Sequence, residues 1–106
     1  MSWLGPDRDG LPSPLATPPR RIVSLVPSQT ELLAALGLDA ETVGLTRFCV
    51  HPADWKARKQ IIGGTKNVRV DRVRQLAPDL VIANKEENVR EQVEAIAAFA
   101  PVWVTD

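Results

Sequence analysis

Cys49 and His51 offer the one thiol and the one imidazole of this sequence, and both groups are common ligands of transition metals. They stand two positions apart, so in an extended loop both side chains can point to the same side. A structural metal site usually has four protein ligands, whereas a metal already held by a macrocycle needs only one or two. The pair therefore fits a metal chelate better than a bare ion.

Two other interpretations of this pair stay open. Cys49 can pack as a small apolar side chain while His51 makes a loop hydrogen bond before Pro52. Alternatively, Cys49 is a nucleophile and His51 is its base, although two positions in one loop give poor geometry for that chemistry. Because no Ser/His/Asp set or carboxylate pair accompanies them, the sequence predicts a binding protein and not an enzyme.

The elements that must position these residues are strands that alternate with helices. This alternation predicts an α/β fold, a Rossmann-like parallel sheet flanked by helices. The strands are short β-branched runs, and the helices show apolar spacing of three and four. The expected strands are 22–26, 42–46, 60–62, 80–83 and 102–105, and the expected helices are 29–36, 53–59, 70–76 and 87–100.

The junction after the first strand has clear local signals. Pro27 should end the strand, Ser28 should cap the next helix, and Glu31 should complete a Ser-x-x-Glu capping box. Gly37 supplies the left-handed residue that commonly ends a helix. On that helix, Leu32, Leu33, Ala35 and Leu36 stand at helical spacing.

Ligands of parallel sheets bind outside the carboxyl ends of the strands, and this rule gathers four dispersed segments at one edge. They are 27–30, 47–51, 65–67 and 84–88. Backbone N–H groups of 63–67 and the Lys66 cation could bind an anionic group there. The expected ligand-binding residues are Pro27, Ser28, Phe48, Cys49, His51, Thr65, Lys66 and Asn84, and the metal ligands among them are Cys49 and His51.

Five runs occur in a fixed order along the chain: RIVSLVPSQTE (21–31), VGLTRFC (43–49), HP (51–52), IGGTKN (62–67) and LAPDLVIA (76–83). In this order and spacing the sequence resembles the cobalamin and iron-chelate solute-binding proteins of ABC importers, the helical-backbone metal receptors. The resemblance covers roughly residues 21–106. It implies the N-terminal α/β lobe of a two-lobed binding protein, with the second lobe and the backbone helix absent from the chain.

The resemblance also implies a function: a substrate-binding component, or a truncated lobe of one, for uptake of cobalamin or another corrinoid, haem or an iron chelate. Phe48 stands where cobalamin-binding relatives carry an aromatic residue that packs on the corrin. Thr65 replaces a tryptophan of the best-known cobalamin binder, so the choice among these ligands stays open. The partner is an ABC transporter permease, with Glu87 and Glu91 beside the aligned docking position, which holds Arg90.

The composition of the chain limits which other classes of partner are expected. Thirteen basic and thirteen acidic residues cancel, which gives no reason to expect nucleic acid or an anionic membrane. No intrinsic cofactor and no membrane span are expected, and the exposed face of a single lobe could drive self-association. Residues 1–20 resemble a flexible proline-rich arm without the apolar core of a signal peptide.

The arm bears on the cellular location. As written, the sequence predicts a cytoplasmic chain, whereas a misassigned start would make it periplasmic or bound to the cell surface. A cytoplasmic protein that binds or senses a metal chelate, without a transport role, is therefore the alternative function.

Overall fold

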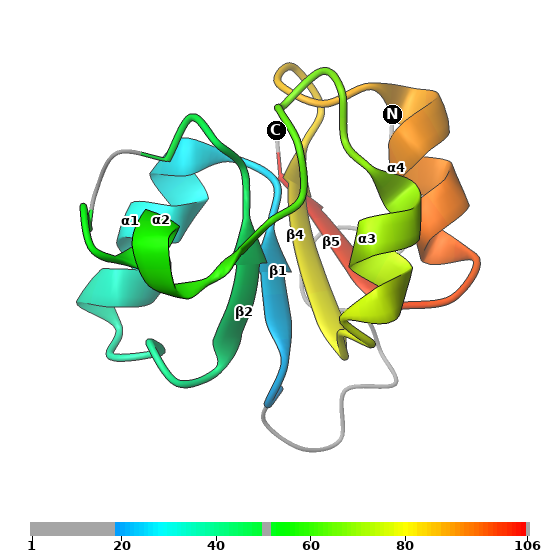
Figure 1. Ribbon diagram of the computed structural model, residues 1–106. Helices are drawn as coiled ribbons and strands as arrows, with labels where there is room; N and C mark the ends of the chain where they lie inside the picture. The colour runs from blue at the N-terminus through cyan, green and yellow to red at the C-terminus, as the bar shows by residue number, and fades with distance from the viewer. Residues whose placement is uncertain (1–18, 50–51, 106) are drawn as a thin grey trace.

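The computed structural model describes residues 19–49 and 52–105 and contains a parallel five-stranded sheet between two pairs of helices (Figure 1). This confirms the predicted α/β fold. The proline-rich arm up to residue 18 and His51 lie outside the described residues. The strands, in sheet order β3-β2-β1-β4-β5, are β1 (Ile22–Ser24), β2 (Thr42–Leu45), β3 (Gln60–Ile61), β4 (Leu80–Asn84) and β5 (Val102–Thr105).

Four helices cover the sheet. Figure 1 shows one pair on each face, α1 with α2 and α3 with α4. The chain runs outward from β1 to β3, returns through α3 to β4 on the other side of β1, and ends in β5. The order of the strands therefore reverses between β1 and β4. The helices are α1 (Pro27–Ala35), α2 (Trp55–Arg58), α3 (Val70–Gln75) and α4 (Arg90–Ala97).

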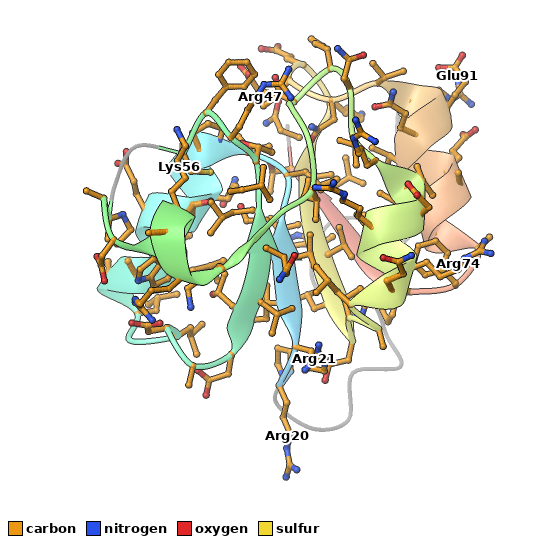
Figure 2. All side chains as sticks on the ribbon, in the orientation of Figure 1. Arg20, Arg21, Arg47, Lys56, Arg74 and Glu91 are labelled. Carbon is orange, nitrogen blue, oxygen red and sulfur yellow. The ribbon has the colours of Figure 1, made fainter. Side chains whose placement is uncertain are left out.

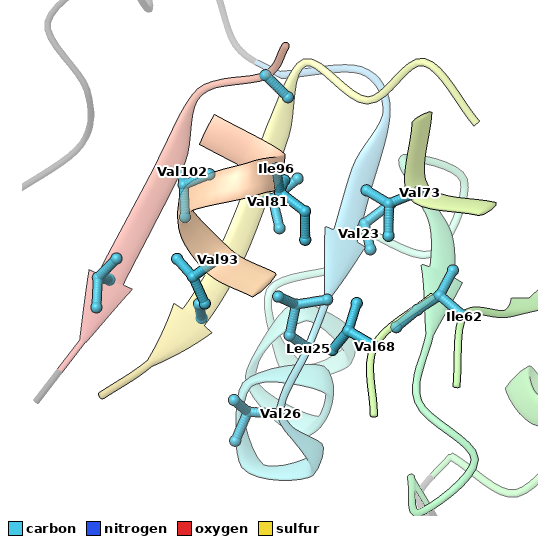
Figure 3. Packing of buried hydrophobic residues seen from close by; sticks show 13 residues of the cluster. Val23, Leu25, Val26, Ile62, Val68, Val73, Val81, Val93, Ile96 and Val102 are labelled. Atoms are coloured by element: carbon cyan, nitrogen blue, oxygen red, sulfur yellow. The ribbon is translucent and has the colours of Figure 1, made fainter. Parts of the chain in front are cut away.

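Each face of the sheet has its own apolar core, because successive side chains of a strand point to opposite faces. Val23 and Val81 belong to the cluster under α3 and α4, while their neighbours Ile22 and Leu80 belong to the cluster under α1 and α2. Figure 3 shows the first cluster, in which α4 contributes Val93 and Ile96 and α3 contributes Val73. The second cluster contains Leu33, Leu45, Cys49, Trp55 and Ile82.

The start of α1 differs from the predicted capping box. The helix begins at Pro27, Val26 is its N-cap residue, and no side chain caps it. Proline suits the first helical position because its φ is already helical and its missing N–H is not needed there. Ser28 therefore lies inside the first turn, and the Ser28 and Glu31 prediction was wrong. Gly37 ends the helix region with a φ of +76°, as predicted.

Two further helix predictions need correction. Leu32 and Leu36 were counted in the apolar spacing of the first helix, but they are 46% and 63% exposed and do not belong to its buried face. The last helix was expected from residue 87 and instead begins at Arg90. Asn84 explains that shift, because its side-chain Oδ1 accepts hydrogen bonds from the backbone N–H groups of residues 86 and 87 and forms a turn there.

Within the described part of the chain, none of the helices has the length and apolar character needed to cross a membrane.

Candidate functional site

The loops that follow the strands meet at one edge of the sheet, which we call the carboxyl edge. The opposite side, where the strands begin, is the amino edge. In Figure 1 the carboxyl edge lies at the top, where β1 leads into α1 and β4 leads toward α4. The reversal of strand order between β1 and β4 places a diverging pair of loops there, the usual ligand position in such sheets.

Asn88 holds three of these loops together. Its side-chain Nδ2 donates to the carbonyl oxygens of Leu25 and Thr65, both at 3.0 Å, and its Oδ1 accepts from the backbone N–H of Asn84 at 2.9 Å. The residue is only 4% exposed. A buried amide with all these partners fixes the geometry of the edge.

Asn84 acts in the same network. Its Nδ2 donates to the hydroxyl of Thr105 at 3.1 Å, and Gln29 of α1 donates to that same hydroxyl at 3.2 Å. Since its Oδ1 holds the following turn, the Asn84 side chain is fully engaged in shaping the edge. Asn88 was expected at this edge as part of segment 84–88, but its hydrogen bonds were not predicted, and Thr105 was not expected at the site. Partners 63 and 76 positions away leave no local signal in the sequence.

Cys49 is placed in the core and not at the surface. Its side chain is 2% exposed, and its Sγ lies 3.1 Å from the hydroxyl of Thr30 and 3.4 Å from that of Thr46. This favours the interpretation that Cys49 packs as a small apolar residue. Because His51 lies outside the described residues, its pairing with Cys49 at a metal stays a prediction. Among the residues described, no three His, Cys, Asp or Glu side chains gather as a metal site would require.

Phe48 lies at the tip of the loop after β2 and is 53% exposed. The guanidinium carbon of Arg47 is 5.0 Å from the centre of its ring, a cation–π contact. The backbone N–H of Arg47 donates to the Gly63 carbonyl at 2.9 Å, which ties this loop to the one after β3. Figure 2 shows Arg47 at the carboxyl edge.

The remaining predicted ligand residues are all at this edge. Thr65 and Lys66 follow Gly64 in the loop between β3 and α3, and the Lys66 ammonium donates to the Glu86 carbonyl at 2.6 Å. Pro27 is half-buried and Ser28 is exposed in the first turn of α1. The structure thus gathers Pro27, Ser28, Phe48, Thr65, Lys66 and Asn84, with Cys49 beneath them.

The two acidic residues predicted to contact the permease lie after β4. Glu87 is exposed in the turn after β4, and Glu91 is exposed in the first turn of α4, as labelled in Figure 2. Arg90 between them is paired with Glu94 at 2.9 Å, and this hydrogen bond raises the pKa of Arg90 above its ordinary value. Contact of Glu87 and Glu91 with a permease stays a prediction.

A model of the periplasmic binding protein family matches residues 22–105 of this chain. The chain belongs to this family. An ABC transporter substrate-binding lipoprotein of Bacillus subtilis, itself uncharacterised, is 38% identical over 87 residues, which are 82% of this chain and 27% of that protein. A vitamin B12-binding protein of Pectobacterium carotovorum is 28% identical and is matched over 77% of this chain and 29% of its own length.

Solved structures of the family share the fold. A periplasmic haem-binding protein of Roseiflexus superposes with a TM-score of 0.75 and 30% identity, over 81% of this chain and 33% of that one. The periplasmic vitamin B12-binding protein of Vibrio cholerae gives a TM-score of 0.74 at 24% identity, over 84% and 35%. The chain spans about a third or less of the length of these family members.

Proposed function

We propose that the carboxyl edge of this chain is one wall of the ligand site of an ABC substrate-binding protein, and that the ligand is a metal chelate. Corrinoids, haem and ferric siderophores are the candidate chelates. The observation that carries the proposal is the Asn88 network, which fixes three loops at the reversal of strand order. The network lies at the carboxyl ends of the strands, where ligands of open parallel sheets bind.

The residues of the wall suit a large, partly apolar ligand. Phe48 offers exposed aromatic surface, against which a flat macrocycle or catecholate can pack. We propose that Pro27, Ser28, Thr65 and Lys66 contact the ligand, with the Lys66 ammonium available to an acidic substituent. Asn84 and Cys49 act indirectly. Asn84 shapes the turn after β4, and Cys49 holds the loop that carries Phe48. His51 remains the candidate axial ligand.

A single wall leaves much of such a ligand uncovered. Binding sites of this size commonly enclose ~70–90% of a ligand's surface. We propose that a second lobe of the binding protein faces the carboxyl edge and covers the rest. Without that cover, a second copy of the chain could occupy the same face.

The names of the family members favour a place outside the cytoplasm, because they describe periplasmic proteins and a lipoprotein. We propose that the chain works there and passes its ligand to an ABC permease, which Glu87 and Glu91 contact. Fractionation of cells that express the native gene tests the location. Recovery only from the cytosol would contradict this proposal and favour a cytoplasmic chelate-binding or sensing protein.

The ligand class is tested by titrating the purified chain into aquocobalamin, haemin and a ferric tris-catecholate, with visible absorbance as the readout. We expect a saturable spectral change with at least one of them and a roughly tenfold weaker affinity for Phe48→Ala, because the ligand loses its aromatic contact. Leu36→Ala is the matched control, since Leu36 is an exposed apolar side chain at the C-terminal end of α1, away from the first turn of that helix. Absence of binding to all three chelates would refute the proposal.

A further inference from the structure

The contact between Arg47 and Phe48 adds a charge to the apolar surface of the wall. Both side chains are exposed, and the guanidinium lies 5.0 Å from the ring centre. Within residues 19–49 and 52–105, no carboxylate forms an ion pair with Arg47, whereas Arg58 and Arg90 are each paired. The Arg47 charge is therefore available to a ligand that reaches the ring.

The turn that carries this pair is held from below. Thr46 and Cys49 flank it in the sequence, both are buried, and the Cys49 N–H donates to the Thr46 carbonyl at 3.2 Å. The thiol and hydroxyl of these two residues are 3.4 Å apart. A turn fixed at both ends presents its two central side chains with little loss of conformational entropy on binding.

Gly64 makes room for the pair. A Cβ built on Gly64 would lie 3.0 Å from Cε2 of Phe48 and 3.1 Å from Nη2 of Arg47, tighter than nine in ten real Cβ contacts, so these side chains would have to shift. Glycine at this position therefore lets both side chains lie over the loop between β3 and α3. The same loop carries the Lys66 ammonium two positions later, while the exposed acids Glu86 and Glu87 lie on the turn after β4.

This arrangement favours one chemical type among the candidate chelates. A guanidinium binds a carboxylate through two parallel hydrogen bonds, and it is already oriented here by the ring beneath it. A neutral ligand would cover the Arg47 charge without replacing the hydrogen bonds that water made to it. A flat ligand with acidic groups at its rim can use the ring and the guanidinium together.

Resting on the proposed function, we infer that Arg47 is a specificity-determining residue and that the site prefers an anionic, carboxylate-bearing chelate to a neutral one. Phe48 receives the apolar face of the ligand, and Arg47 binds its acidic group. Gly64 is the positioning residue that permits this arrangement.

Haemin and haemin dimethyl ester test this inference, because they share one metal macrocycle, and the ester carries neutral methyl esters in place of the two carboxylates. Both are titrated into the chain and followed by the Soret absorbance. We expect haemin to bind roughly tenfold more tightly than the ester. Arg47→Gln should lower the haemin affinity roughly tenfold and change that of the ester less than about twofold. Arg47→Lys should recover part of the loss, since it keeps the charge without the planar donors.

Arg74→Gln is the matched control. Arg74 makes the same contact with Phe99, also at 5.0 Å, and Figure 2 shows it well away from Arg47. The control variant should retain the preference for haemin. Equal affinities for haemin and its ester, or an equal loss of both in Arg47→Gln, would refute charge selection while chelate binding stands. Binding of aquocobalamin alone would likewise refute it, and absence of all binding would refute the proposed function as well.

Discussion

The two edges of the sheet contain the same contact in different surroundings. Arg47 lies 5.0 Å from the ring centre of Phe48 at the carboxyl edge, and Arg74 lies 5.0 Å from that of Phe99 at the amino edge. Phe99 is half-buried against the core under α3 and α4, whereas Phe48 leaves 53% of its surface in water. The Phe99 ring therefore contributes to folding, whereas the Phe48 ring contributes little to it. An exposed ring of this kind is what we expect of a binding residue.

Charged groups show the same contrast. At the amino edge, Asp39 pairs with Arg58 at 2.9 Å and Lys59 at 2.7 Å, and Asp79 accepts the backbone N–H groups of residues 20 and 21. At the carboxyl edge the buried polar groups are amides and hydroxyls, and the Arg47 cation is left for a ligand. The amino edge pairs its charged side chains with one another. At the carboxyl edge the Lys66 ammonium bonds to a backbone carbonyl, and the Arg47 cation stays accessible.

The largest difference in stability between variants of the two edges is expected at two glycines of positive φ. Gly63, at +107°, belongs to the carboxyl edge, and an added Cβ would collide with the Asn67 carbonyl oxygen. Gly63→Ala should lower the free energy of unfolding by about 2–4 kcal/mol. Gly37→Ala, at the amino edge with open space around it, should cost about 1 kcal/mol. Urea denaturation measures both, and equal losses would contradict the packing of the 63–67 loop.

Removal of the central side chain from each polar network should have the next largest effect. Asn88→Ala leaves the buried Leu25 carbonyl and two further backbone groups without their partner, so we expect a loss of about 2–3 kcal/mol in unfolding free energy. Asp79→Ala should cost only about 1 kcal/mol, because water reaches the exposed groups it binds. Denaturation midpoints test this order, and a smaller loss for Asn88→Ala would disprove it.

The two phenylalanines provide a smaller and more direct comparison. Phe99→Ala should lower the unfolding free energy by about 2 kcal/mol, because it removes apolar surface packed against the core. Phe48→Ala should cost about 0.5 kcal/mol, the value of an exposed cation–π contact. Thermal and urea unfolding of both variants provide the measurement. If Phe48→Ala proved as destabilising as Phe99→Ala, the ring would have a structural role and the binding interpretation would lose its basis.

The smallest expected effect is a pH dependence at the amino edge. Hydrogen bonds from Lys59 and then Arg58 lower the pKa of Asp39 from 3.8 to about 2. A lowered folded-state pKa means that the paired carboxylate stabilises the fold above pH ~4 and loses this contribution as the pH falls through about 2. Asp39→Asn should therefore be less stable than the parent at pH ~6 and approach it near pH ~2. Parallel stability curves for the two proteins would contradict this assignment.

Strands β1, β2, β4 and β5 were predictable because each is a short, largely apolar run with buried residues. The third strand, β3, has only two residues and neither is buried. The helix starts were less predictable. Ser28 and Glu31 satisfied a local capping pattern, but Pro27 one position earlier is the better first helical residue. The expected start of the last helix failed for a similar reason, because Asn84 holds the following backbone in a turn.

The candidate site was predictable in its location and not in its details. The rule for parallel sheets correctly gathered the loops after β1, β2, β3 and β4 at one edge, since it depends only on strand direction. Cys49 was the most conspicuous residue of the sequence, yet its side chain is buried beneath that edge. Arg47 and Asn88 lie in the segments 47–51 and 84–88 that were expected at this edge, but neither was among the expected ligand-binding residues, because a lone arginine and an asparagine beside glutamates are ordinary on a surface.

Local sequence is thus sufficient to predict the apolar strand runs, their alternation with helices and the left-handed residue Gly37 after the first helix. These features depend only on side-chain period and backbone sterics within a few residues. The tertiary structure decided which polar groups are buried and which charges stay accessible. Asn88 bonds to Leu25 across 63 positions, and the Arg47 and Phe48 pair lies over Gly64 of another loop. Such contacts depend on how the strands are ordered in space, which no short segment specifies.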